Sequence, residues 1–243
     1  MATQAQENTI ESPALPFAIS LRKQTLLSAL ATAACLFGGL LLGLSAGIAF
    51  SNLPMHMPDK TMNLISVILV LCILFASGTV WGSLIARISS SVNLRRMRWA
   101  GALSFAPSII LAGFTLASLE RIIVERGQGP DLPIHVVFTI LFVPAVFFIA
   151  GTGGLALGIA LRSLRLGLRL AAGSGLSAAL AFLCIDLLMD ALGWRVGAPG
   201  AAERATMLTV MMAGALAAAL VGGGTLGYLI SRYLRIIRVN LAR

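Results

Sequence analysis

Six long apolar runs dominate this sequence and limit what it can fold into. They cover residues 26–50, 62–86, 99–119, 134–161, 170–191 and 206–231. A helix needs roughly 20 apolar residues to cross the roughly 30 Å hydrocarbon core of a bilayer. Charged residues make up only 11% of the chain, whereas a soluble domain carries about 25% to keep its surface wetted. The sequence therefore predicts an all-α, polytopic integral membrane protein with six transmembrane helices.

The segments outside these runs are too short to form a separate soluble domain. We expect a transmembrane domain at residues 25–231, an N-terminal tail at 1–24 and a basic C-terminal extension at 232–243. The first run is longer than the apolar core of a signal peptide, which has about 7–15 residues, so we expect it to remain as a helix.

Basic residues in the connections predict the orientation of the helices. With the N-terminus inside, thirteen of the eighteen Lys and Arg residues fall on the inner side and five on the outer side. Seven of the nine acidic residues lie outside or toward the outer end of a run. Because Lys and Arg accumulate in cytoplasmic loops, we expect both termini in the cytoplasm and the protein in the inner (cytoplasmic) membrane. Trp81 and Trp99 are expected near the inner interface, which amphipathic rings prefer.

Comparison of the chain with itself indicates an internal repeat. Residues 61–87 and 206–232 share eight identities in 27 positions, including a Gly-x3-Gly-x4-Arg frame. The fourth run ends with a related Gly-x3-Gly-x3-Arg sequence, and the three arginines, Arg87, Arg162 and Arg232, are 75 and then 70 residues apart. This pattern predicts three tandem helical hairpins of parallel topology. Convergence is the alternative, because every returning helix needs small packing residues and an inner arginine.

Glycines at four-residue spacing mark several helix faces. Such a face lets two backbones approach closely, which is how helices associate in lipid without a hydrophobic driving force. The candidate helix-packing residues are Gly39, Gly43, Gly47, Gly78, Gly82, Gly154, Gly158, Gly223 and Gly227. A pore lined by glycine backbone is the alternative interpretation.

One acidic residue lies clearly inside an apolar run. This is Asp186, and Asp190 follows one turn later on the same helical face. A carboxylate in a membrane is expensive, so the pair is a candidate proton or cation site. Asp186 lies only about 7 Å from the outer end of its run, at 1.5 Å per residue. Structural pairing with Arg195 or Arg204 is therefore the alternative.

The inner basic stretches are candidates for binding anionic lipid headgroups. The residues are Arg87, Arg162, Arg165, Arg169, Arg232, Arg235 and Arg238. Those at 162–169 are expected to share one helical face, and so are those at 232–238. Each charge near an anionic surface contributes about 1 kcal/mol. Because the net charge of +9 resides in connections between apolar runs, we expect lipid and not nucleic acid as its partner. The alternative is that these arginines only fix the orientation of the helices in the membrane.

No constellation of catalytic or metal-binding residues is visible in the sequence. The two histidines, His56 and His135, both fall at the outer face, and no cysteine or carboxylate cluster completes a zinc pattern. We expect neither enzymatic activity nor a cofactor. The leading hypothesis is a non-catalytic integral membrane subunit that packs through glycine-rich helix faces against partner membrane subunits in a larger complex. The alternative is a small permease or the membrane component of a multi-subunit transporter, which the same architecture fits.

Overall fold

The computed structural model describes residues 20–51, 59–89, 93–125, 134–192 and 201–241. The described chain forms six α-helices: α1 (Leu21–Ser51), α2 (Asp59–Ile88), α3 (Leu94–Glu125), α4 (Ile134–Ala160), α5 (Leu164–Ala191) and α6 (Ala201–Leu241). Five of them are long and apolar enough to cross a membrane; in α3, the side chains at 111–117 lie outside the described ones. The chain is an all-α polytopic membrane protein, and this prediction is confirmed.

Two helices extend beyond the boundaries expected for the membrane domain. α1 begins at Leu21, four residues before the expected membrane domain, and the hydroxyl of Ser20 caps it by accepting a hydrogen bond from the backbone N–H of Lys23 at 3.3 Å. α6 continues to Leu241, so the basic extension is helical at 232–241. That stretch contains neither Gly nor Pro to end a helix.

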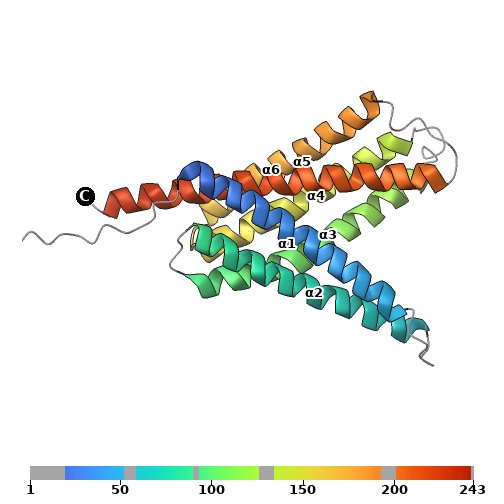
Figure 1. Ribbon diagram of the computed structural model, residues 1–243, viewed down its shortest axis with the longest axis horizontal. Coiled ribbons are helices and arrows are strands. Elements are labelled where there is room, and N and C mark those ends of the chain that lie inside the picture. The colour runs from blue at the N-terminus through green and yellow to red at the C-terminus, as the bar shows by residue number, and fades with distance from the viewer. Residues whose placement is uncertain (1–19, 52–58, 90–92, 126–133, 193–200, 242–243) are drawn as a thin grey trace, which may run out of the picture.

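The six helices form a ring in chain order. Each helix packs against the next one, and α1 packs against α6 to close the ring. We call the end that carries the α2–α3 and α4–α5 connections the basic end. Figure 1 shows that the helices converge near this end, and that α1 and α2 diverge from the others toward the opposite end. The last turns of α6 reach beyond the rest of the bundle (Figure 1).

One apolar cluster seals the ring toward the basic end. Every helix contributes a buried side chain to it, in order Cys35, Trp81, Met97, Leu157, Leu170 and Ile230. A second, smaller cluster lies farther from the basic end on α5 and α6, around Phe182, Ala178 and Ala218. Dispersion contacts in such clusters hold helices together in lipid, where hydrophobic burial contributes little.

Candidate functional site

The predicted glycine pair of α2 lies at a very close helix contact. A Cβ added at Gly78 would be 2.9 Å from the carbonyl carbon of Gly101 on α3. A Cβ added at Gly82 would be 2.9 Å from the carbonyl carbon of Met97, also on α3. Backbone therefore lies directly against backbone here, which only glycine permits.

The glycine pair of α4 makes an equivalent contact with α5. A Cβ added at Gly154 would be 2.6 Å from the carbonyl carbon of Leu170, and Gly158 lies directly against the backbone of Gly167. The short connection from α4 to α5 brings these positions opposite one another, since the two helices run antiparallel.

The glycine pair of α6 packs on α1. A Cβ added at Gly223 would be 2.5 Å from the Cβ of Thr32, and Gly227 lies directly against the Ser28 side chain. Each returning helix therefore places its glycine pair on the first helix of the following hairpin, and α6 closes the cycle on α1. Three equivalent hairpins arranged in a ring would make this pattern, so it supports the predicted repeat.

The glycines of α1 pack within the first hairpin. A Cβ added at Gly39 would be 2.8 Å from the Cβ of Ser77, and Cβ atoms added at Gly43 and Gly47 would be 3.4 and 3.5 Å from the Val70 side chain. All nine predicted packing glycines thus contact helices of their own chain. A partner protein cannot occupy these faces while the ring is formed.

Exposed basic residues surround the basic end of the bundle. The described ones are Arg22, Lys23, Arg87, Arg95, Arg96, Arg98, Arg162, Arg165, Arg169, Arg232 and Arg235. Arg238 lies in α6, and its side chain is outside the described ones. The acidic residues of the described ranges all lie in the opposite halves of their helices. The described charged residues at the basic end are therefore all positive, which makes this end complementary to anionic groups.

The α4–α5 connection corrects the expectation that Arg162, Arg165 and Arg169 share a helical face. Arg162 lies just after the end of α4 and has a φ of 59°, in the left-handed region. The backbone N–H of Ser163 reaches the carbonyl of Gly158 at 3.0 Å, as in a Schellman helix end. Ser163 then caps α5, which starts at Leu164. Only Arg165 and Arg169 belong to one helix, because the chain reverses direction between them and Arg162.

The carboxylate of Asp186 is buried between α4 and α5. The side chain is 1% exposed, and the hydroxyl of Thr139 on α4 donates a hydrogen bond to its Oδ2. Asp190 lies in α5 one turn later, but its side chain is outside the described ones, as are Arg195 and the side chain of Arg204. The predicted acid–acid and acid–arginine pairs therefore lie outside the described structure. Sequence reasoning missed Thr139, because nothing in the sequence pairs positions 47 residues apart.

Trp81 lies at the centre of the ring, so its expected interfacial position is wrong. The side chain is 2% exposed, and its indole N–H donates a hydrogen bond to the Thr32 hydroxyl on α1 at 2.9 Å. Its ring packs against Phe105 of α3 with centroids 5.2 Å apart, and it lies beside Gly153 of α4. The short distance in sequence between Trp81 and Arg87 indicates how deep Trp81 lies along the helix, but not on which side of the helix its ring lies. Trp99 is exposed, and its expected position near the inner interface stays a prediction.

Within the described residues, no group of three His, Cys, Asp or Glu side chains is placed to hold a metal ion. The chain matches no protein-family model, no curated protein and no solved structure. What bears on function is therefore the packing of the helices, their free faces and their charges.

Proposed function

We propose that this chain is a non-catalytic integral membrane subunit that binds a partner membrane protein along α1. The observation that carries the proposal is the free face around Gly38. Among the described residues nothing lies within 4 Å of a Cβ added at Gly38, in contrast to the nine predicted glycines. Ala34, Ser45 and Ala49 share this helical face and are exposed, together with Leu41 and Leu42, which are 51% and 65% exposed.

A face that combines small residues with exposed leucines suits a second transmembrane helix better than it suits lipid alone. Small side chains let another backbone approach closely and gain van der Waals contact along its length, and a serine offers an interhelical hydrogen bond. The position of α1 supports this use. Its outer half diverges with α2 from the other helices, so α2 is its main neighbour there (Figure 1).

The proposal includes an orientation and a membrane. Both termini lie in the cytoplasm, and the basic end meets the anionic headgroups of the inner (cytoplasmic) membrane.

The backbone conformation of Arg162 supports a functional role for the positive charge of its side chain. A non-glycine residue in the left-handed conformation costs about 1–2 kcal/mol, which a glycine at this helix end would avoid. Arg162 therefore occupies this position at an energetic disadvantage.

The test is a bulky substitution at the free face. In Gly38→Trp the new side chain enters open space, so the purified chain should unfold at the same denaturant concentration as wild type. The complex isolated from native membranes in mild detergent should nevertheless lose its partner on native electrophoresis. Leu176→Trp, at an exposed position of α5, should retain it. A wild-type chain that migrates alone, or a Gly38→Trp chain that keeps the partner, would contradict the proposal.

A second candidate function is that of a permease or transporter component, and Asp186 favours it. A buried intramembrane carboxylate held by a hydroxyl from a neighbouring helix can exchange a proton or bind a cation. The test is uptake by reconstituted vesicles, together with a solute-dependent rise in unfolding temperature. Both should disappear in Asp186→Asn if the carboxylate is the site. Uptake that survives this substitution excludes the carboxylate, and a co-purifying ATPase would favour a transporter complex over the first proposal.

A further inference from the structure

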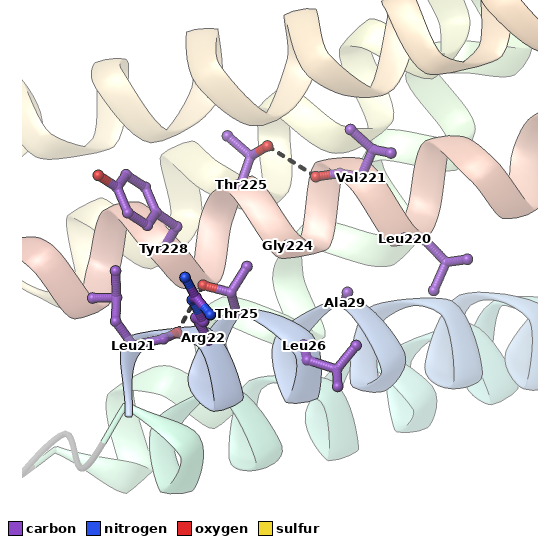
Figure 2. A pocket seen from close by; sticks show the side chains of 10 residues that line it. All are labelled: Leu21, Arg22, Thr25, Leu26, Ala29, Leu220, Val221, Gly224, Thr225 and Tyr228. Carbon is purple, nitrogen blue, oxygen red and sulfur yellow. Dashed lines mark hydrogen bonds between the residues drawn. The ribbon is translucent and has the colours of Figure 1, made fainter. Parts of the chain in front are cut away.

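A groove of about 640 Å³ runs along the outside of the seam between α1 and α6. It extends from Leu21 to Ala29 on α1 and from Leu220 to Tyr228 on α6, and Figure 2 shows both helices with the side chains that line it. At a rise of 1.5 Å per residue, each wall is about 12 Å long. The groove opens on the side of the bundle, where a transmembrane protein meets the bilayer.

The floor and walls of the groove are apolar. The floor is left open at Gly224, which has no side chain, and a Cβ added there would lie 3.6 Å from the Cβ of Ala29. Two threonines line the groove, but their hydroxyls donate hydrogen bonds to carbonyls of their own helices. Thr25 bonds to the Leu21 carbonyl and Thr225 to that of Val221, both at 2.9 Å. Hydrocarbon can therefore fill the groove without leaving these hydroxyls unpaired.

One end of the groove is polar and positively charged. Arg22 and Tyr228 lie together at this end, whereas Leu220 lies at the other (Figure 2). Arg232 follows Tyr228 by one turn on the same face of α6, and Lys23 follows Arg22. The described acidic residues lie at the far ends of their helices. An anion is therefore complementary to this end, with guanidinium and phenol groups as donors.

We propose that the groove binds one anionic phospholipid. An acyl chain lies between α1 and α6, and the phosphate accepts hydrogen bonds from the Arg22 guanidinium and the Tyr228 hydroxyl. The length of the groove favours a lipid over a partner helix. Its walls of about 12 Å match one leaflet, half of a hydrocarbon core roughly 30 Å thick, whereas a transmembrane helix would need a contact through both leaflets. The site is independent of the proposed partner face on α1.

The experiment measures lipid retention by native mass spectrometry. Full-length protein is reconstituted with equal amounts of phosphatidylglycerol and phosphatidylcholine of identical acyl chains, then transferred to detergent. Wild type should retain one phosphatidylglycerol in preference to phosphatidylcholine. Arg22→Gln should reduce this preference about fivefold, which corresponds to about 1 kcal/mol for one basic residue near an anionic group. Arg22→Lys should restore most of it, and Arg96→Gln, at an exposed arginine of α3 outside the groove, should leave it unchanged.

A second pair of variants tests the acyl-chain groove. Val221→Trp places a large ring across a groove position, whereas Leu216→Trp does so on the same helix outside the groove; the wild-type side chains are 45% and 43% exposed. Only Val221→Trp should lose the retained lipid, with an unfolding midpoint equal to that of Leu216→Trp. Equal retention of both lipids by wild type would overturn the proposal. Equal loss from Arg22→Gln and Arg96→Gln, or a protein helix crosslinked into the groove, would overturn it as well.

Discussion

Replacing Gly82 by alanine tests whether backbone contact between α2 and α3 sets the stability of the ring. The new Cβ would lie 2.9 Å from the carbonyl carbon of Met97 and closer still to its oxygen, whereas ordinary contact begins at 3.4 Å. The two helices must therefore separate by about 0.5 Å or more, because both obstacles are backbone. Such overpacking typically costs about 1–3 kcal/mol. Alanine recovers about 0.5–1 kcal/mol through its higher helix propensity, so we expect a net loss of about 1–2 kcal/mol.

The assay is reversible unfolding in mixed micelles of a mild and a denaturing detergent, followed by circular dichroism. Gly38→Ala is the matched control, because it makes the same chemical change in a helix where the new Cβ meets nothing within 4 Å. It should leave the free energy of unfolding unchanged or raise it by up to about 1 kcal/mol. The reasoning is refuted if Gly82→Ala is as stable as wild type, or if Gly38→Ala loses as much stability.

Three further predictions concern the buried acid, the second apolar cluster and the orientation. Thr139→Val should lower the free energy of unfolding by about 1–3 kcal/mol, because it removes the hydroxyl that donates a hydrogen bond to the buried carboxylate of Asp186. When Thr139→Val is combined with Asp186→Ala, the two losses should be less than additive. Simple additivity would argue against coupling between the two side chains. Phe182→Ala should lower the free energy of unfolding by about 3–5 kcal/mol in the same assay. Phe148→Ala, at a side chain that is 39% exposed, should change it by only about 0.5 kcal/mol. Equal losses of stability in the two variants would contradict the assignment of Phe182 to the core. A cysteine introduced at Asn93, in a background lacking native cysteines, should react with a membrane-impermeant maleimide only after cells are permeabilised, and labelling of intact cells would reverse the orientation.

The candidate site was only partly predictable from the sequence. Asp186 stands out because a carboxylate is conspicuous in an apolar run, but its partner Thr139 does not, since threonines are ordinary in membrane helices. Trp81 was misplaced because distance along the chain measures depth and not rotation about the helix axis. Helical periodicity places Arg162 on one face with Arg165 and Arg169, whereas in the structure it follows the end of α4 in a left-handed conformation. That helix end depends on local hydrogen bonds to Gly158 and Ile159, which periodicity does not reveal.

The number and type of the elements follow from the sequence by itself. A bilayer admits apolar segments only as helices whose backbone bonds are satisfied internally, so six sufficiently long runs imply six helices. Which faces of those helices touch was decided by the tertiary structure. In lipid almost any apolar face can be accommodated, so apolarity does not distinguish inside from outside. The closure of α6 on α1, the burial of the predicted glycines and the open face at Gly38 arise instead from steric fit between backbones, which depends on residues far apart in the chain.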